Sequence, residues 1–330
     1  MNWGTLVKRI SGLLGLILAV VLVAAACGGD DDEKTVGFAN ILRTGCEFCN
    51  DVENGVTAET ADAGWELYAL DHDLDANKML ANADAMITRE VDVYLNFDGG
   101  ITNYEATLEK MADAEIPMIF IDGPIPEPAD DVYWFGAHGQ SAGQQMGEYA
   151  LDYINNNWGG NVDGIFGIYQ STWPDETKAR MVVAMDVISQ QFPEWTMDTI
   201  TLNDVVLEGS ETQAAAAAYL NANPDAKNLL FIATTNDLAG VAVVAAMEQL
   251  GRLDAGVVLS NGGASDALAE IRDPDSPFIM SIGYFPDRYG EFLRPIIATI
   301  LDGDTPAQRV NHVTHVPIDA SNIDEWYPEG

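Results

Sequence analysis

The sequence predicts an α/β protein whose parallel sheets are arranged in two lobes. Short apolar segments rich in β-branched and aromatic residues alternate with segments of helical periodicity almost without interruption. This alternation is typical of parallel sheets with helices on both faces, and so many units fit two lobes better than one large sheet. The 330 residues are 48% hydrophobic and 20% charged, which excludes a disordered polyelectrolyte and an integral membrane protein.

Ten of the apolar segments are expected to be strands, at 35–40, 65–71, 91–97, 117–122, 132–137, 162–170, 196–202, 228–234, 256–261 and 277–284. Helical periodicity marks 75–89, 104–115, 141–156 and 239–250. In such sheets, ligands bind at the carboxyl ends of the strands, so the residues that follow each strand are candidate site residues. These are polar or aromatic at 40–48, Asp122, 170–173, Thr235-Asn236, Asn261 and Tyr284.

The amino terminus has the composition of a targeting segment. Lys8 and Arg9 precede an apolar run at 10–26 that serine and glycine interrupt. The run is short for a spanning helix, which needs about 20 residues, and is typical of a signal peptide. An uncleaved signal anchor is the alternative.

The residues around Cys27 resemble the lipobox of bacterial lipoproteins. Small residues stand directly before Cys27, although Ala24 occupies a position where leucine is commoner. The resemblance implies that residues 1–26 are a signal peptide and that Cys27 carries a lipid. Residues 27–34 then form a flexible, charged tether. We therefore expect an extracytoplasmic protein that a lipid holds at the cell membrane, on its periplasmic side or its outer surface.

The chain is strongly acidic, with 52 Asp and Glu against 15 Lys and Arg and a formal net charge of −37. Without a basic surplus it has nothing to replace the counterions of a phosphate backbone, so nucleic acid is excluded as a partner. Self-repulsion of this size weakens a compact state unless salt screens it. A saline habitat and lineage drift both remain open as explanations.

The order of the segments resembles the ribose-type sugar-binding proteins of ABC importers. The stretches that carry the resemblance are VGFAN, LDHDLDANK, IPMIFIDG, TTNDLAG, VVLSNGG and SIGYFPDRYG. The resemblance implies the type I periplasmic binding protein fold, with two Rossmann-like lobes joined by a three-crossover hinge and a sugar bound between them. It places lobe one at 35–136 and 286–312, and lobe two at 137–285 and 313–330.

The resemblance also assigns site residues by position. Phe48 falls near the aromatic residue that stacks on the sugar, and Asp122 on the carboxylate that accepts bonds from sugar hydroxyls. Arg180 lies about where the family has an arginine. Asn236 matches an asparagine, Asn261 stands in place of an aspartate, and Tyr284 falls on a hinge-side glutamine.

Two departures from the family pattern bear on the ligand. Gly123 replaces the arginine that follows the first aspartate, and an insertion brings Cys46 and Cys49 close to the stacking position. The resemblance therefore implies the fold but not which sugar is bound.

The chemistry of these side chains suits a sugar independently of the family. Sugar hydroxyls both donate and accept hydrogen bonds, and C–H faces pack on aromatic rings. Carboxylates accept, amides do both, and lysine and arginine only donate. For each residue, loop chemistry or core packing is the alternative. The expected ligand-binding residues are Phe48, Asp122, Trp173, Lys178, Arg180, Thr235, Asn236, Asn261 and Tyr284.

Metal binding is not expected. Asp71 to Asp75 resembles the start of a calcium loop, but Ala76 and Asn82 replace the required glycine and glutamate, so helix-capping aspartates are the better interpretation. His312 and His315 are expected on one strand with side chains on opposite faces, where they would not share a metal. His72 and His138 are interpreted as surface or loop residues.

Cys46 and Cys49 have the C-x-x-C spacing of thiol oxidoreductases. No thioredoxin-like domain accompanies them, and outside the cytoplasm two such cysteines most simply form a structural disulfide. Free thiols and a catalytic thiol pair are the alternatives.

These observations predict a lipid-anchored solute-binding protein that captures a neutral sugar or polyol by hinge closure and delivers it to the permease of an ABC importer. We expect a monomer with no enzymatic activity and no cofactor. A sensor of the same fold, passing a sugar-like signal to a membrane receptor, is the alternative.

Overall fold

The structure is a computed structural model, and it describes residues 34–97, 103–170, 175–193, 197–202, 209–233 and 236–328. The predicted signal segment, Cys27, Trp173 and Thr235 lie outside these residues. Two six-stranded sheets form the framework. Each is parallel except where β12 joins β10, so the predicted fold class is confirmed.

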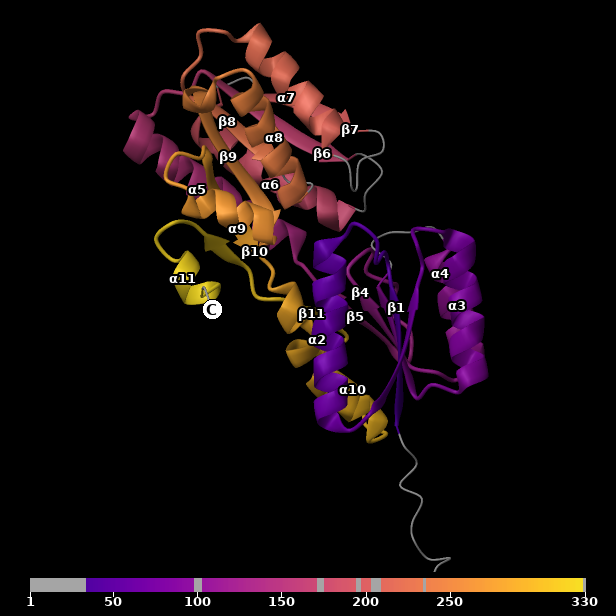
Figure 1. The fold of residues 1–330 in the computed structure, drawn as a ribbon. Helices are drawn as coiled ribbons and strands as arrows, with labels where there is room; N and C mark the ends of the chain where they lie inside the picture. The colour runs from indigo at the N-terminus through magenta and orange to yellow at the C-terminus, as the bar shows by residue number, and fades with distance from the viewer. Residues whose placement is uncertain are drawn as a thin grey trace, which may run out of the picture. The chain divides into compact units, whose positions relative to one another are not determined.

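The first sheet has the strand order β11-β5-β4-β3-β1-β2. Its strands are β1 (Thr35–Asn40), β2 (Glu66–Asp71), β3 (Val93–Phe97), β4 (Met118–Ile121), β5 (Val132–Gly136) and β11 (Val310–His312). Figure 1 shows α2 (Glu47–Ala63) and α10 (Tyr289–Leu301) on one face, and α3 (Ala76–Arg89) and α4 (Tyr104–Asp113) on the other.

The second sheet has the strand order β12-β10-β9-β8-β6-β7. Its strands are β6 (Gly164–Gln170), β7 (Met197–Leu202), β8 (Leu229–Ala233), β9 (Gly256–Gly262), β10 (Phe278–Gly283) and β12 (Val316–Ile318). One face carries α5 (Gly139–Trp158) and α6 (Asp175–Gln191), and the other carries α7 (Ser210–Ala222), α8 (Asp237–Gln249) and α9 (Ser265–Arg272) (Figure 1). The short elements are η1 (Leu253–Ala255), η2 (Pro286–Arg288) and α11 (Ile323–Trp326).

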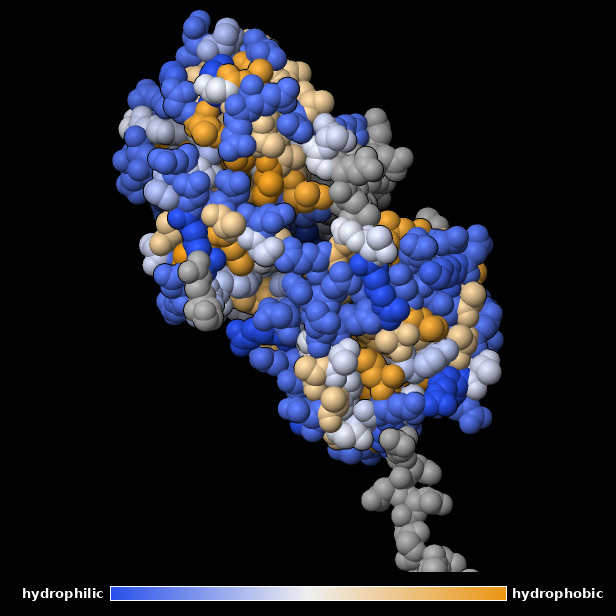
Figure 2. Space-filling view, in the orientation of Figure 1, coloured by the Kyte–Doolittle hydropathy of each residue, from blue (hydrophilic) through white to orange (hydrophobic). Residues whose placement is uncertain are grey.

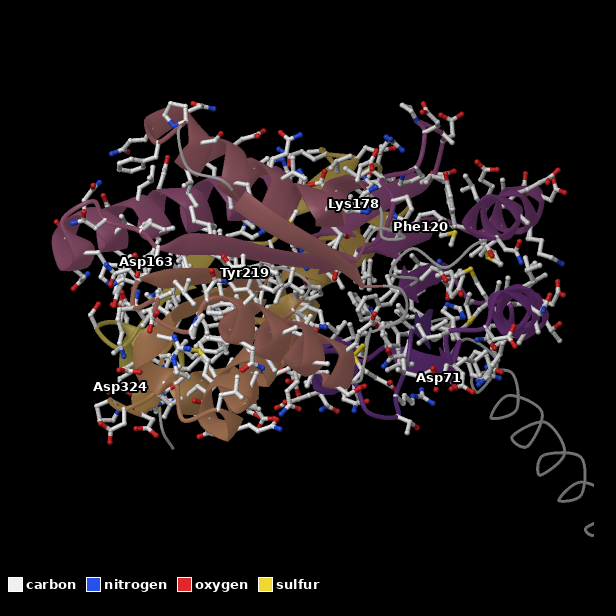
Figure 3. All side chains as sticks on the ribbon, turned by 90° about the horizontal axis from the view of Figure 1, so that it is seen from above. Asp71, Phe120, Asp163, Lys178, Tyr219 and Asp324 are labelled. Carbon is white, nitrogen blue, oxygen red and sulfur yellow. A yellow bond between two sulfur atoms is a disulfide. The ribbon has the colours of Figure 1, made fainter. Side chains whose placement is uncertain are left out.

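Burial on both faces explains why these strands are so apolar. Ile165 and Leu230 pack with α5 and α6, whereas the next residue of each strand packs with α7 and α8. Tyr219 of α7, labelled in Figure 3, stacks on Phe166 with ring centroids 4.3 Å apart. Strands covered in this way are near-continuous hydrophobic runs.

Helices α5 and α6 approach each other at the level of their backbones. A Cβ atom added to Gly143 of α5 would lie 2.7 Å from the carbonyl oxygen of Ala179 and 2.8 Å from that of Arg180. Gly139 meets the carbonyl of Glu176 in the same way. Glycine on α5 therefore sets the position of α6 and of the residues that α6 carries.

The surface in view is largely hydrophilic. Figure 2 shows a face on which hydrophilic residues predominate over both sheets, with apolar residues in small, separate groups. None of the described helices combines the length and the apolar character needed to cross a membrane.

The prediction that His312 and His315 share a strand is wrong, and the prediction that His72 is a surface or loop residue holds only for the loop. His312 ends β11 of the first sheet, whereas His315 precedes β12 of the second, so they do not share a strand. The chain changes sheets between them, which the alternation pattern could not show. His72 lies in a loop but is fully buried, because two asparagine side chains satisfy its ring nitrogens. The helix-capping interpretation of this aspartate run is confirmed for Asp75, whose side chain caps α3 by accepting from the N–H groups of Asn77 and Lys78.

Candidate ligand-binding site

Asp122 directly follows β4, at the carboxyl edge of the first sheet. Its Oδ1 accepts the N–H of Ala137 at 2.9 Å, and its Oδ2 accepts the hydroxyl of Tyr289 at 3.3 Å. Loss of hydration raises the pKa of Asp122, while the Ala137 N–H, the charge of Arg180 and the Tyr289 hydroxyl oppose that rise. The carboxylate is thus held in one orientation by donors from two segments.

Arg180 extends from α6 toward the ends of the strands in the second sheet. Its Nη1 donates to Asn261 Oδ1 at 3.1 Å, and its guanidinium carbon lies 4.9 Å from the centre of the Tyr284 ring. A guanidinium over an aromatic face is attracted by the ring quadrupole. Together with its attraction for Asp122, these contacts place Arg180 between the polar groups of both sheets.

Tyr284 and Asn261 are buried side by side after β10 and on β9. The Tyr284 hydroxyl donates to Asn261 Oδ1 at 2.8 Å. Burial raises the pKa of Tyr284 above its ordinary value, so the phenol keeps its proton and can donate. Asn261 Oδ1 therefore accepts from both Tyr284 and Arg180.

Phe48 supplies an aromatic wall from the first turn of α2. Its ring is half-buried and meets Tyr289 edge-on at 5.8 Å and Phe97 at 6.5 Å. Because Tyr289 also bonds Asp122, Phe48 is connected to the carboxylate through a single side chain. The structure thus links five of the predicted residues: Phe48, Asp122, Arg180, Asn261 and Tyr284.

Two other predicted residues have local partners. Lys178 forms an ion pair with Asp175 at 2.7 Å, one turn away on α6 (Figure 3 labels Lys178). Asn236 caps α8, because its Oδ1 accepts the N–H of Ala239 at 3.1 Å. Its backbone carbonyl also accepts the Ser260 hydroxyl at 2.8 Å. The binding roles of Lys178 and Asn236, like those of the five residues above, remain predictions.

The carboxylate of Asp237 organises the loop that follows Asn261. It accepts the N–H groups of Gly263 at 2.6 Å and Ala264 at 2.8 Å, and the Ser281 hydroxyl at 2.7 Å. Burial raises the pKa of Asp237, and these donors oppose the rise. Asp237 is not among the predicted site residues, although it directly follows Asn236 and begins α8.

The segments that connect the two sheets meet beside Tyr284. The N–H of His138 donates to His315 Nε2 at 2.9 Å, and the Tyr284 ring lies edge-on to His315 at 5.3 Å. Burial first, and Arg180 next, lower the pKa of His315 to about 4. His315 is therefore neutral at pH 7 and can accept this bond.

Cys46 and Cys49 lie at the start of α2 on either side of Phe48. The structure pairs them with Cα atoms 5.3 Å apart. Cys46 also caps the helix, since its sulfur accepts the N–H of Cys49 at 3.2 Å. The pair therefore lies at the start of α2, which packs on the first of the two large sheets.

The fold and the candidate site define the class of the protein. It is a two-lobed α/β binding protein with polar and aromatic groups at the carboxyl ends of its parallel strands. A family model described as a periplasmic binding protein domain matches residues 36–305. The chain therefore belongs to the periplasmic binding protein family, whose members bind solutes outside the cytoplasm and are not enzymes.

The chain is similar to several proteins of sugar transport. It is 24% identical to the fructose import binding protein FruE of Bifidobacterium longum, over 83% of this chain and 81% of that protein. A solved structure of the arabinose ABC transporter binding protein of Shewanella sp. ANA-3 has a TM-score of 0.76 and 17% identity, with 89% and 94% of the two chains covered. An Agrobacterium vitis solute-binding protein with bound allitol has a TM-score of 0.74 and 21% identity, with 89% and 98% covered. These similarities establish the type I periplasmic binding protein fold.

Proposed function

We propose that this protein captures a neutral sugar or sugar-like polyol outside the cytoplasm and delivers it to an ABC importer. The observation that carries the proposal is the connected set of Asp122, Arg180, Asn261 and Tyr284 with the Phe48 ring beside it. A carboxylate acceptor, a guanidinium donor, an amide and an aromatic wall are the groups that a polyhydroxylated ring requires. The relatives named above point to the same ligand class.

Arg180 supports a ligand with an acceptor oxygen. Its Nε is buried, and no residue in the described part of the chain accepts a hydrogen bond from it. An unpartnered buried donor costs free energy that an oxygen of the ligand would recover. The carboxylate of Asp122 and the acidity of the whole chain disfavour strongly anionic ligands such as sugar phosphates.

Anchoring by a lipid on Cys27 is part of the same proposal. The small residues before Cys27 and the charged tether after it support this assignment. Mass spectrometry of protein isolated from the membrane fraction would show a lipid-modified amino-terminal cysteine, and Cys27→Ser would release the protein from membranes.

A thermal-shift panel of monosaccharides, polyols, nucleosides, amino acids and sugar phosphates tests the ligand class. A ligand at 100 times its dissociation constant adds about 2.7 kcal/mol to the free energy of unfolding, which gives a clear rise in Tm. We expect the rise with neutral sugars or polyols. Stabilisation by amino acids alone, or tight binding of a phosphorylated sugar, would refute the proposal.

Two matched arginine variants then test the site. Arg180→Lys removes the planar donor above Tyr284 and should weaken binding about tenfold or more. Arg294→Lys makes the same change on α10, where Arg294 forms an ion pair with Glu59 of α2, and it should leave affinity unchanged. Equal affinities for both variants would show that Arg180 does not contribute to ligand binding.

Transport and sensing are separated by a membrane assay. Uptake by vesicles that contain the importer permease should depend on added binding protein and ligand. Binding to a receptor, with no stimulation of uptake, would favour the sensor.

A further inference from the structure

Tyr289 connects the aromatic and polar halves of the candidate site. It is the first residue of α10 and is fully buried. Its hydroxyl donates to Asp122 Oδ2 at 3.3 Å, across 167 positions of sequence. Its ring meets Phe48 and Phe135 edge-on, with centroids 5.8 and 5.0 Å away.

The backbone that carries Tyr289 has little room to move. The neighbouring residue, Gly290, packs directly against α2, where an added Cβ atom would lie 2.9 Å from the N atom of Val56 and closer still to the carbonyl of Gly55. Backbone contact at this point fixes the start of α10 against α2. The hydroxyl of Tyr289 is therefore held at a defined place relative to Asp122.

We propose that Tyr289 is a positioning residue for ligand recognition: it orients Asp122 so that Oδ2 accepts a hydroxyl of the ligand. This inference rests on the proposed function, in which Asp122 binds the ligand. Tyr289 itself need not touch the ligand.

The hydrogen-bond pattern at Asp122 predicts a preference for ligands with a hydroxyl group at this point. Oδ1 is occupied by the Ala137 N–H, and Tyr289 takes one direction at Oδ2. A carboxylate in this position accepts a bond from a ligand hydroxyl and repels an ether or carbonyl oxygen. A ligand that lacks a hydroxyl at this point should bind more weakly.

The charges around Asp122 determine how Tyr289 acts. Arg180 faces the carboxylate from α6, Tyr284 faces it from the segment after β10, and Tyr289 faces it from α10. Burial, followed by the charge of Asp122, raises the pKa of Tyr289 above its ordinary value. The phenol therefore stays protonated and donates, which favours the ionised form of Asp122.

Tyr289→Phe tests this role, because it removes the hydroxyl and keeps the buried ring. Calorimetric titration with the best neutral ligand of the panel should show affinity about five- to tenfold weaker at pH 7.5. The pH at which affinity is lost on the acid side should move upward, since the Asp122 carboxylate has lost a donor. Carbon NMR of the Asp122 carboxyl group in ligand-free protein should show the same upward shift.

Tyr149→Phe is the matched control. The Tyr149 hydroxyl donates to Asp319 Oδ2 at 3.0 Å, so the same group is removed from a different carboxylate. Affinity and its pH profile should match those of the wild type. Thermal melting of both variants checks that each is folded.

The readouts separate failure of this inference from failure of the proposed function. An Asp122 titration that is identical in wild type and Tyr289→Phe overturns the inference, as does weaker binding with an unchanged pH profile. If wild type binds no neutral sugar or polyol, the proposed function fails, and the NMR titration alone decides whether Tyr289 controls Asp122.

Discussion

The hydrogen bonds of the buried His72 ring depend on its protonation state. Its Nε2 lies 2.8 Å from Asn96 Oδ1 and its Nδ1 lies 3.1 Å from Asn82 Nδ2. A neutral ring that donates from Nε2 and accepts at Nδ1 satisfies both amides. Burial lowers the pKa of His72 to about 4, and the bond to Asn96 only partly opposes this.

The first prediction is that acid destabilises the protein through His72. An unfolded histidine titrates near pH 6.5, above the folded value, so the unfolded state takes up the proton first as pH falls. The free energy of unfolding should therefore fall from about pH 7 toward pH 4, by up to about 3 kcal/mol from this residue. Urea denaturation of wild type and His72→Gln at several pH values measures the difference, and parallel pH slopes would contradict it.

The Cys46–Cys49 pair has a consequence for ligand binding. A ring closed over so few residues removes little chain entropy, so a disulfide here would add only about 2 kcal/mol to the free energy of unfolding. Its position on either side of Phe48 supports a different use. The bridge would fix the turn that directs Phe48 toward Tyr289 and reduce the cost of ordering it on binding.

We predict that reduction, or Cys46→Ser with Cys49→Ser, weakens ligand binding several-fold while lowering Tm only modestly. Calorimetric titration and thermal melting measure the two effects. Intact-mass analysis after alkylation of unreduced protein should detect no free thiol at either position. Two alkylated cysteines would exclude the disulfide. Unchanged affinity after reduction would show that the disulfide has no role in ligand binding.

At the scale of elements, the contact between α5 and α6 determines where Arg180 lies. Gly143 faces the carbonyl oxygens of Ala179 and Arg180 at distances that leave no room for a methyl group. The helical pattern of the sequence correctly indicated a helix at 141–156, and α5 extends from Gly139 to Trp158. That pattern did not reveal the backbone contact, because periodicity describes one helix at a time.

Gly143→Ala should therefore push α6 away from α5. We expect the free energy of unfolding to fall by about 1–3 kcal/mol through overpacking, although alanine favours the helix itself. Ligand affinity should fall as well, because the backbone of Arg180 moves. Chemical denaturation and calorimetric titration test both effects. Gln144→Ala, at the exposed next position, is the control, and a Gly143→Ala protein as stable and tight-binding as wild type would refute the prediction.

At the scale of the whole molecule, the two sheets repeat one strand order. In each sheet the first strand of the set lies between the second and the third, and a strand from the carboxyl-terminal part of the chain completes one edge. The chain passes between the sheets after β5, after β10 and between β11 and β12. Three such connections are the expected hinge of a two-lobed binding protein.

We predict that ligand closes the two lobes by rotation about segments near 136, 285 and 313. Small-angle scattering should give a smaller radius of gyration with saturating ligand than without it. A non-binding sugar from the same panel is the control. A radius that does not change at saturation would rule out hinge closure.

The net charge of −37 gives the last prediction. Salt screens repulsion among the carboxylates, so Tm should rise as sodium chloride increases over the sub-molar range. The same series with a neutral osmolyte, such as sucrose, separates screening from preferential exclusion. A Tm that stays flat with sodium chloride would show that self-repulsion contributes little to stability and would remove the argument for a saline habitat.

The sequence by itself determined the class of fold and most of the strands, because burial on both faces makes each parallel strand a local apolar run. It also indicated Asp122, Arg180, Asn261 and Tyr284, since they follow or adjoin strand ends or match positions of a known family. Only the tertiary structure decided that Tyr289 bonds Asp122, that Asp237 holds the loop after Asn261 and that His312 and His315 belong to different sheets. These are contacts between segments far apart in sequence, and hydrophobic periodicity carries no information about which distant segments meet.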